Sequence, residues 1–343
     1  MVKTMKAAVI QAPHSNIEIQ QRARPTPAAG EVLIRVHACG VCHGDLMVQQ
    51  GAFPFAPYPI VPGHEIAGVI EVVGDQVRTV KIGDRVGISA LFSSCGNCHL
   101  CHQGDEFLCP HMQFTGVTKD GGYAEFMLAP AGYAVPLPAK LDFANAAPLM
   151  CAGLTVFSAL RHADFRPGQK VAVTGLGGLG HMAVLFARAM GARVAVLSSS
   201  AEKKEEAFSL GAERFINVKV ENAAEALRSW DGGADMILHT ASANAPAEAA
   251  FAGLSPNGTL VILGVGPGSL TIDPMNLIMG RRRIMGSPAG SRNDLRDTLE
   301  FAASNNIRPR MRTFALEQAA QALALMHEGH LAGRAVLQIT DPS

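Results

Sequence analysis

Four of the seven cysteines lie in one short segment with the spacing of zinc ligands. Thiolates two residues apart can point at one tetrahedral centre, and the glycines and proline of this segment favour the tight turns that such wrapping requires. Four sulfur ligands leave no coordination position open, so the pattern predicts a structural zinc site in a lobe over residues 93–110. Four unrelated reduced thiols are the alternative, which so specific a pattern disfavours. The predicted ligands are Cys95, Cys98, Cys101 and Cys109.

The remaining cysteines, together with one histidine, could form a second site with different chemistry. Two thiolates and an imidazole, from Cys42, Cys151 and His64, would leave the fourth position of a tetrahedral zinc open to water or substrate. Because these residues are far apart in sequence, spacing alone does not establish the site, and His64 could be a core histidine. Cys39 and Cys42 could instead form a redox pair, but no thioredoxin-like βαβ pattern surrounds them.

A glycine-rich loop follows a predicted strand and precedes a predicted helix, which is the context that a dinucleotide-binding loop requires. Gly175 allows the tight turn, Gly177 lets the backbone approach a pyrophosphate, and Gly180 permits close packing of helix on strand. Free N–H groups at the start of the helix would bind the phosphates, whereas a turn without a ligand is the alternative. The predicted cofactor loop comprises Gly175, Gly177, Gly178, Leu179 and Gly180.

The end of the next predicted strand favours NADP(H) over NAD(H). An Asp or Glu at this position would accept hydrogen bonds from the adenosine ribose. This chain instead has Ser198, Ser199 and Ser200, followed within a helical turn by Lys203 and Lys204. No carboxylate would repel a 2′-phosphate, and the lysines could neutralise it. Alternatively the serines cap the next helix and the lysines are merely solvated, a reading compatible with phosphate binding.

Composition limits the class of protein. The chain has 343 residues, of which 48% are hydrophobic and 17% charged, so it can bury a large core and is expected to form two domains. Lys+Arg and Asp+Glu are equal at 29 each, which gives no reason to expect a nucleic-acid or membrane partner. The basic run Arg281–Arg283 suits a solvated or subunit-facing edge. No signal-peptide pattern or membrane-spanning apolar run is evident, so a soluble, cytoplasmic protein is expected.

These residues lie in two regions that differ in their predicted secondary structure. Up to about residue 150, short β-type runs are broken by Gly and Pro, which predicts an irregular, mostly β catalytic domain over residues 1–152. Beyond it, strands alternate with helices, which predicts an α/β domain with a doubly wound parallel sheet over residues 153–292. The tail, residues 293–343, carries a helix and a strand that suit a return to the first domain.

The predicted elements are as follows. Strands in the first domain are expected at Lys6–Ile10, Val32–His37, Ile66–Val73 and Arg85–Ile88. In the second domain, strands are expected at Lys170–Thr174, Arg193–Leu197, Ala234–His239 and Thr259–Leu263, and helices at His181–Met190 and Ala201–Leu210. In the tail, a helix is expected at Leu316–Glu328 and a strand at Ala335–Ile339.

The motifs occur in the order typical of one enzyme family. They are Gly-Val-Cys42-His43-x-Asp45, Gly63-His64-Glu65, the four-cysteine lobe, Cys151 with Thr155, the Gly175 loop and the terminal Gly333-Arg334. Through them the chain resembles the zinc-dependent medium-chain alcohol dehydrogenases, which implies a GroES-like catalytic domain and a Rossmann cofactor domain. Through Leu197–Ser200 and the following Lys203-Lys204-Glu-Glu-Ala it is most similar to the cinnamyl alcohol dehydrogenase branch, which prefers NADP(H).

The resemblance implies two zinc ions per chain, one in the lobe and a catalytic one held by Cys42, His64 and Cys151. It implies that Asp45 orients a ligand, and that Glu65 lies near the metal, where it could tune the charge or take part in ligand exchange. Subunits of this family associate, so a homodimer or homotetramer is expected. The other implied cofactor positions are His43 and Arg334 at the pyrophosphate, Thr155 at the nicotinamide, and Val265.

The implied reaction is hydride transfer between NADP(H) and an alcohol or aldehyde, aromatic or of medium length, whose oxygen zinc polarises. The family usually relays the proton through a Ser or Thr and a His, but this chain has Gly44 and Met47 at those positions. Water or the cofactor ribose could bridge the gap, aided by His43, or solvent could enter the space that Gly44 leaves. Alternatively the enzyme reduces a conjugated C=C or an imine, which needs no proton delivered to an oxygen there.

Overall fold

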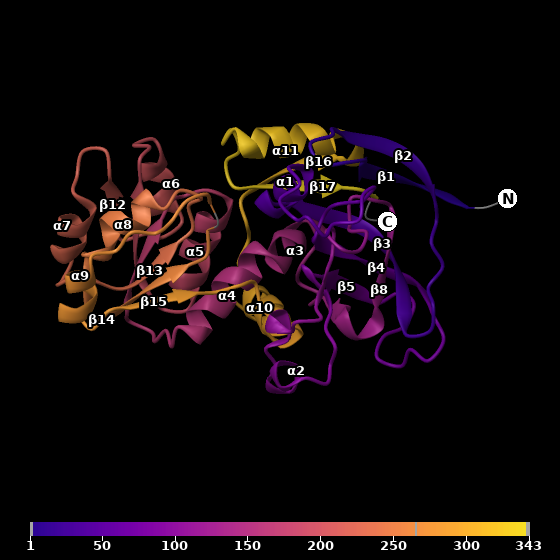
Figure 1. The fold of residues 1–343 in the computed structure, drawn as a ribbon, viewed down its shortest axis with the longest axis horizontal. Helices are drawn as coiled ribbons and strands as arrows, with labels where there is room; N and C mark the ends of the chain where they lie inside the picture. The colour runs from indigo at the N-terminus through magenta and orange to yellow at the C-terminus, as the bar shows by residue number, and fades with distance from the viewer. Residues whose placement is uncertain (1–2, 265, 341–343) are drawn as a thin grey trace. The chain divides into compact units, whose positions relative to one another are not determined.

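The structure, a computed structural model, describes residues 3–264 and 266–340 and divides into two units (Figure 1). The first unit comprises Met1–Leu154 and Gly290–Ser343, and the second comprises Thr155–Ala289. Val265, a predicted cofactor position, lies outside the described residues. The sequence analysis placed domain boundaries after residues 152 and 292. These boundaries stay a prediction.

The first unit is built on a seven-stranded sheet in the order β16-β17-β3-β4-β5-β9, with β8 paired to β3. An antiparallel hairpin, β1–β2, and a small β6–β7 pair complete its strands. The bounds are β1 Thr4–Ile10, β2 Ile17–Ala23, β3 Glu31–Val41, β4 Glu65–Val73, β5 Arg85–Ile88, β6 Leu91–Ser93, β7 Gln113–Phe114, β8 Phe126–Pro130, β9 Val135–Pro136, β16 Met311–Ala315 and β17 Arg334–Gln338.

Short helices join these strands, and the longest helix of the first unit, α10, follows the second unit in the chain. It begins with a capping box, in which Ser291 and Asp294 each accept the other's backbone N–H. The bounds are α1 His43–Gln49, α2 His99–Gln103, α3 Phe143–Ala146, α10 Arg292–Ser304 and α11 Ala319–His327, with 3₁₀ turns at Glu106–Leu108, Ala131–Tyr133, Ala147–Met150 and Leu316–Gln318.

Strand pairing brings the predicted ligand motifs to one end of the sheet. β3 and β4 are antiparallel with Gly40 opposite Glu65, so the residues after β3 and before β4 lie at the same end. β17 pairs with the other edge of β3, with Ala335 opposite Val41, and its first residue is Arg334. Segments some 300 residues apart in sequence therefore meet at the end of β3.

The second unit contains a six-stranded, entirely parallel sheet in the order β12-β11-β10-β13-β14-β15. Numbered within the unit this order is 3-2-1-4-5-6, the doubly wound arrangement that binds dinucleotides at the reversal beside the first strand. The predicted α/β class is thus confirmed. The bounds are α4 Ala152–His162, β10 Lys170–Thr174, α5 Gly178–Ala189, β11 Arg193–Ser198, α6 Lys203–Ser209, β12 Arg214–Asn217, α7 Ala223–Arg228, β13 Ala234–His239, α8 Ala245–Phe251, β14 Leu254–Ile262, α9 Pro274–Met279 and β15 Arg283–Gly286.

The sequence expectations missed some elements and displaced others. The helix expected from Leu316 begins as a 3₁₀ turn and becomes α-helical only at Ala319. The helix expected from Ala201 begins at Lys203. β2, β16 and α10 were not expected. β2 and β16 contain few apolar residues, and α10 has a low mean hydropathy.

Among the described residues, no single helix is long and apolar enough to cross a membrane. One bent pair, Phe143–Met150 with Ala152–His162, meets that test by length and composition alone.

Candidate metal centres and cofactor site

The first cluster gathers residues from the end of β3, the start of β4 and a 3₁₀ turn. Cys42 caps α1 directly after β3, and His64 precedes β4. Cys151 directly follows the turn Ala147–Met150, whose side chains are all buried. Ligand atoms of Cys42, His64, Glu65 and Cys151 lie within 4.8 Å of one another. The structure thus brings together side chains that are more than 100 residues apart in sequence.

The spacing of these atoms suits a tetrahedral metal. The sulfurs of Cys42 and Cys151 are 3.8 Å apart. Two thiolates at the usual zinc–sulfur distance on a tetrahedron would be about 3.8 Å apart. A hydrogen bond from the Cys151 thiol, aided by the charge of His64, holds the pKa of Cys42 well below its usual range. The pKa of Cys151 is held well above it, chiefly by the same hydrogen bond, since two sulfurs in contact share one proton unless a cation is present.

Asp45, on the first turn of α1, links the segments that carry the two ligand motifs. Its carboxylate accepts hydrogen bonds from His64 Nδ1 at 3.1 Å and from the backbone N–H of Cys42 at 2.9 Å. It also accepts from the N–H of Gly63 and from the hydroxyl of Tyr123. With Nδ1 donating to Asp45, the Nε2 lone pair of His64 is left for a metal. Tyr123 was missed by the sequence analysis, since an aromatic residue in a loop carries no signal of such a role.

Glu65 and Arg334 form a buried ion pair beside the same cluster. Arg334 donates to Glu65 Oε1, and both side chains are almost fully inaccessible to solvent. Glu65 Oε2 has no hydrogen-bond partner within the described part of the chain. Burial raises the pKa of Glu65 to about 7, against the opposing effect of Arg334. A Cβ at Gly40 would lie 1.9 Å from Glu65 Oε2, so only glycine at position 40 leaves room for this carboxylate.

Gly44 and Met47 lie on α1, next to the cluster. A Cβ on Gly44 would lie 2.9 Å from Cε1 of His64, closer than real Cβ atoms approach any atom. The imidazole ring occupies the space on this side of Gly44, and entry of solvent beside Gly44 stays a prediction. His43, the first residue of α1, is exposed, and Met47 is half-buried.

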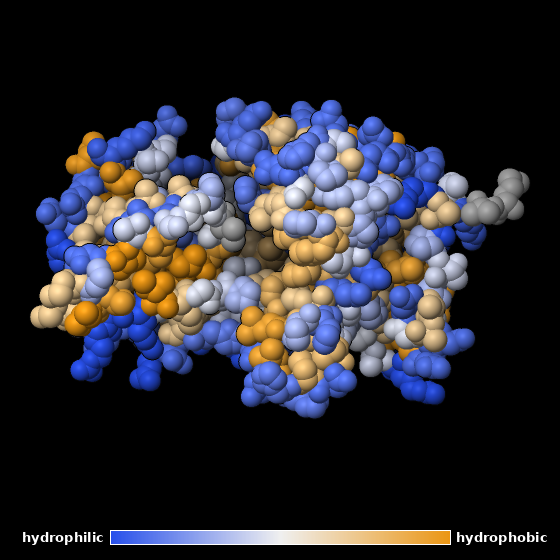
Figure 2. Space-filling view, viewed as in Figure 1, coloured by the Kyte–Doolittle hydropathy of each residue, from blue (hydrophilic) through white to orange (hydrophobic). Residues whose placement is uncertain are grey.

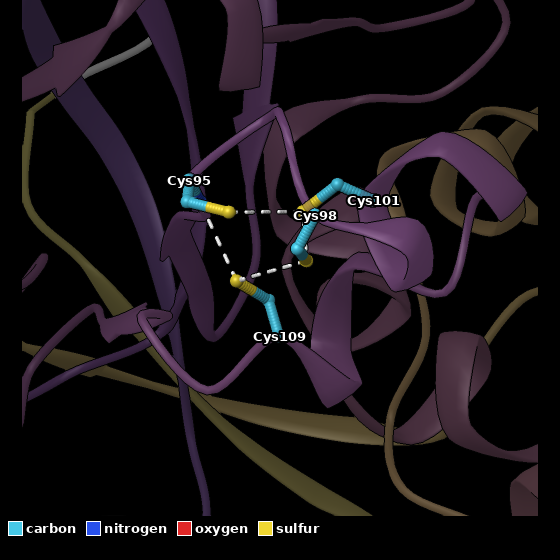
Figure 3. A group of neighbouring side chains, drawn as sticks. All are labelled: Cys95, Cys98, Cys101 and Cys109. Carbon is cyan, nitrogen blue, oxygen red and sulfur yellow. Dashed lines mark hydrogen bonds between the residues drawn. The ribbon is translucent and has the colours of Figure 1, made fainter.

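The second cluster is the four-cysteine lobe, whose side chains turn toward one another (Figure 3). The sulfur–sulfur distances are 3.5 Å for Cys98–Cys101 and 3.9 Å for both Cys95–Cys101 and Cys98–Cys109. These again match the edge of a zinc–thiolate tetrahedron, about 3.8 Å. Hydrogen bonds from the backbone, the N–H of Asn97 first, hold the pKa of Cys95 at about 6. The donor set and geometry of the lobe therefore fit zinc.

The lobe is tied to the rest of the first unit by two contacts at its base. Tyr133 accepts the backbone N–H of Ser94 through its hydroxyl, and the Ser94 hydroxyl contacts the sulfur of Cys101. Glu106, in the 3₁₀ turn before Cys109, is buried and accepts hydrogen bonds from the guanidinium and backbone of Arg292. These contacts fix the direction from which the lobe leaves the sheet.

The glycine loop joins β10 to α5 in the second unit. Gly175 has φ +88°, a conformation that favours glycine, and a Cβ on Gly180 would lie 2.0 Å from the carbonyl oxygen of Gly175. Around Gly177, by contrast, a Cβ would meet nothing within 4 Å. Its side-chain space is open, as close approach of a pyrophosphate to the backbone would require. No side chain caps α5, so its first N–H groups are free for phosphate oxygens.

The serines at the end of β11 do not cap the next helix, so the alternative that they do is wrong. α6 has Glu202 as its N-cap, and the helix begins one residue later because Ala201 and Glu202 form a turn. Ser198 Oγ instead accepts the N–H of Ser200 at 3.2 Å. Lys203 pairs with Glu206 at 2.8 Å, whereas Lys204 is exposed. Of the other implied cofactor positions, Thr155 is buried on α4 in the second unit, and His43 and Arg334 belong to the first.

Comparison with known proteins agrees with this geometry. Residues 28–139 match the "Alcohol dehydrogenase GroES-like domain" family and residues 178–304 the "Zinc-binding dehydrogenase" family. An alcohol dehydrogenase of Geobacillus stearothermophilus is 39% identical over 338 residues, which cover 98% of this chain and 100% of that protein. The chain belongs to the zinc-containing medium-chain alcohol dehydrogenase family.

Solved structures of cinnamyl alcohol dehydrogenases are similar to the structure of this medium-chain dehydrogenase. The cinnamyl alcohol dehydrogenase SbCAD4 from Sorghum bicolor superposes with a TM-score of 0.90 at 32% identity, over 98% of both chains. A cinnamyl alcohol dehydrogenase from Helicobacter pylori complexed with NADP(H) gives 0.88 at 28% identity, over 98% of this chain and 99% of that one. The predicted fold, a GroES-like and a Rossmann unit, is thus confirmed. The protein is an alcohol dehydrogenase-type oxidoreductase of a family that uses zinc and a nicotinamide cofactor.

Proposed function

We propose that this dehydrogenase interconverts alcohols and aldehydes with NADP(H) and binds two zinc ions per chain. The observation that carries the proposal is the convergence of Cys42, His64 and Cys151 on one point, with Asp45 holding the histidine. Three such ligands leave one tetrahedral position for the substrate oxygen, whereas the lobe's four sulfurs leave none. Catalytic and structural roles are therefore divided between the two clusters.

Bound zinc would act as a Lewis acid on the substrate oxygen, and the nicotinamide would carry the hydride. The chain's own residues position these groups. Asp45 keeps the Nδ1 proton of His64, so that Nε2 faces the metal position. Glu65 places an unpartnered carboxylate oxygen beside that position, where it balances charge or exchanges with a ligand. Arg334 neutralises Glu65 and, as the family resemblance implies, faces the cofactor pyrophosphate.

The preference for NADP(H) rests on the residues after β11. Ser198, Ser199 and Ser200 present hydroxyl groups in place of a carboxylate, so none of these three side chains repels a 2′-phosphate. Because Lys203 is already paired with Glu206, exposed Lys204 is the cation better able to bind that phosphate. The glycine loop at the start of α5 supplies the pyrophosphate site.

The route of the proton differs from the one usual in the family, because Gly44 and Met47 carry no transferable proton. His43 is exposed on the first turn of α1 and, with water or the cofactor ribose, offers the replacement route. If no such route operates, the same fold would serve reduction of a conjugated C=C or an imine, in which no oxygen needs this proton. Substrate preference decides between the two reactions.

We also propose that the chain forms a homo-oligomer through the β15 edge of the second unit. One edge of β15 has no strand partner in the described part of the chain. Beside it, α9 exposes Met275, Ile278 and Met279, and Figure 2 shows hydrophobic side chains gathered over this region. A second copy is the fitting occupant, because two identical strand edges pair antiparallel about a two-fold axis.

The two-zinc proposal is tested by metal analysis of the purified protein and of two cysteine variants. We expect about two zinc ions per chain in the wild type and about one in Cys42→Ser. Cys39→Ala is the matched control, since Cys39 is buried near Cys42 but belongs to neither cluster, and it should keep both ions. Zinc confined to the lobe of the wild-type protein would contradict the proposal.

Turnover is tested in parallel with matched saturated aldehydes, enones and imines, each with NADPH and with NADH. We expect the aldehydes to be reduced fastest, and with NADPH. Faster turnover of enones or imines than of the matched aldehyde would favour the second reaction instead.

A further inference from the structure

Tyr123 lies outside every ligand motif, yet it contacts the residue that orients the candidate ligand His64. Its side chain is fully buried, and its hydroxyl donates to Asp45 Oδ2 at 2.9 Å from 78 residues further along the chain. Of the chain's three tyrosines, Tyr133 contacts Ser94 at the base of the lobe and Tyr58 donates to Val48, whereas Tyr123 donates to Asp45 beside the Cys42 cluster. Burial and the nearby Asp45 raise the pKa of Tyr123 well above its usual value, so the phenol stays a donor.

The Asp45 carboxylate divides its hydrogen bonds evenly between its two oxygens. Oδ1 accepts from the N–H of Gly63 at 3.0 Å and from His64 Nδ1 at 3.1 Å. Oδ2 accepts from the N–H of Cys42 at 2.9 Å and from Tyr123. Three of these donors belong to the ligand motifs themselves. Tyr123 is therefore the only donor that fixes the carboxylate from outside them.

Tyr123 is itself held firmly against the turn that carries His64. Its backbone N–H donates to the carbonyl oxygen of Pro62, and its carbonyl oxygen accepts from the N–H of Ala8. Its ring packs on Gly63, where a Cβ would lie 2.3 Å from Cδ1 of the ring. The hydroxyl thus reaches Asp45 from a side chain with little freedom to move.

We propose that Tyr123 is a positioning residue for the catalytic metal, whose hydroxyl fixes the rotation of the Asp45 carboxylate and thereby the direction of the His64 imidazole. The inference rests on the proposed role of Cys42, His64 and Cys151 as zinc ligands. Without the hydroxyl, Oδ2 keeps a single backbone donor, and the carboxylate can turn away from His64 Nδ1. The imidazole then loses the hydrogen bond that sets its tautomer and its angle toward the metal.

The test is a comparison of Tyr123→Phe with Tyr58→Phe. The first variant keeps the ring and its packing and removes only the hydroxyl. The second removes a phenol hydroxyl from the same unit that donates to the carbonyl oxygen of Val48 instead. Metal release to a chelator would be followed for both ions, together with the visible spectrum of the protein loaded with Co²⁺ and the thermal stability of each variant.

In Tyr123→Phe we expect the catalytic metal to be released about tenfold or more faster, with the lobe metal unaffected, because partners that orient ligands commonly contribute that much. The cobalt bands of the catalytic site should shift, while Tyr58→Phe should match the wild type. Wild-type release and spectrum in Tyr123→Phe, with or without a lower melting temperature, would overturn the inference. Absence of metal from the Cys42 cluster in the wild type would instead overturn the proposed function.

Discussion

Arg292, the first residue of α10, holds the carboxylate of Glu106 at the base of the four-cysteine lobe, 186 residues earlier in the chain. Nε lies 2.9 Å and 3.0 Å from the two carboxylate oxygens, and a further amino group donates to the carbonyl oxygen of Gly132 at 2.8 Å. The guanidinium also lies 4.4 Å from the centre of the Tyr133 ring. The C-terminal part of the chain thereby anchors the lobe.

Arg292→Ala is accordingly expected to lower stability by about 1–3 kcal/mol, because it leaves the buried Glu106 carboxylate without its main donors. The lobe metal should also be released to a chelator faster than in the wild type. Arg308→Ala is the control, since Arg308 donates to the carbonyl oxygens of Lys140 and Ile307 outside the lobe. Equal effects of the two substitutions would argue against an anchoring role for Arg292.

Ser198→Asp should shift the cofactor preference toward NADH. The new carboxylate at the end of β11 would repel a 2′-phosphate and accept hydrogen bonds from a ribose. We expect KM for NADPH to rise at least about tenfold, with a much smaller change for NADH. Steady-state kinetics with both cofactors measures this, and an unchanged ratio would count against the assignment.

Lys204→Gln and Lys203→Gln form a matched pair for the same question. Lys204 is exposed, whereas Lys203 is already paired with Glu206. We therefore expect Lys204→Gln to raise KM for NADPH more than Lys203→Gln does. The reverse order would show that Lys203 leaves Glu206 to bind the phosphate.

Gly44→Thr is expected to reduce aldehyde turnover even though it adds the hydroxyl that the family resemblance implies at this position. The added Cβ would lie 2.9 Å from His64 Cε1, so the imidazole must move and the catalytic metal should be held less firmly. Zinc content measured beside kcat separates this effect from the chemistry of the relay. Higher kcat with full zinc content would mean that His64 yields and that the hydroxyl completes the relay.

The only tryptophan, Trp230, should report the protonation of Glu213. Its indole N–H donates to Glu213, whose pKa Arg193 lowers from 4.5 to about 2. A carboxylate with a lowered folded-state pKa contributes stability above pH 4.5 that is lost as the pH falls toward 2. Trp230 emission should therefore change over this range, and Glu213→Gln should abolish the change. If Trp230 emission changed over the same pH range in Glu213→Gln, Glu213 could not be the source of the change.

Ile278→Lys should disrupt self-association, because the side chain is 68% exposed beside the β15 edge and a buried ammonium would be unpaired there. Light scattering should give the mass of a single chain, 36.1 kDa, for this variant and a multiple of it for the wild type. Val220→Lys is the control, since Val220 is 79% exposed just after β12, at the other end of the sheet. A wild-type mass equal to that of a single chain would contradict the proposed self-association.

The sequence was most informative where the interacting residues are neighbours. The lobe cysteines lie within 15 residues, and Gly175, Gly177 and Gly180 follow a single strand. Their spacing alone was therefore enough to predict a zinc site and a dinucleotide-binding loop. The parallel sheet was predictable for the same reason, since each strand and helix shows its own pattern. The convergence of Cys42, His64 and Cys151 could be suggested by residue type but not established by spacing, because strand pairing and a buried 3₁₀ turn create it.

Other contacts left no local signal. Tyr123 and Arg292 act through partners 78 and 186 residues away, and neither residue type distinguishes such a role from packing or solvation. α10 did have a signal, the Ser291–Asp294 capping box followed by Leu295 and Leu299 one turn apart. The serines at the end of β11 suggested a cap because Ser is a common N-cap residue, whereas α6 begins two residues later than expected, with Glu202 as its N-cap.

The meeting of β17, β3 and β4 at one end of the sheet has a consequence for the order of folding. The lobe's four sulfurs come from one short stretch, so a chain that is still largely unfolded can gather them around an ion at a small cost in loop closure. The other centre requires Cys42, Cys151 and the Glu65–Arg334 pair, and so requires strand pairing across almost the whole chain. With two metals bound as proposed, the lobe can therefore acquire its ion early and guide assembly, while the other centre becomes competent only when the fold is complete.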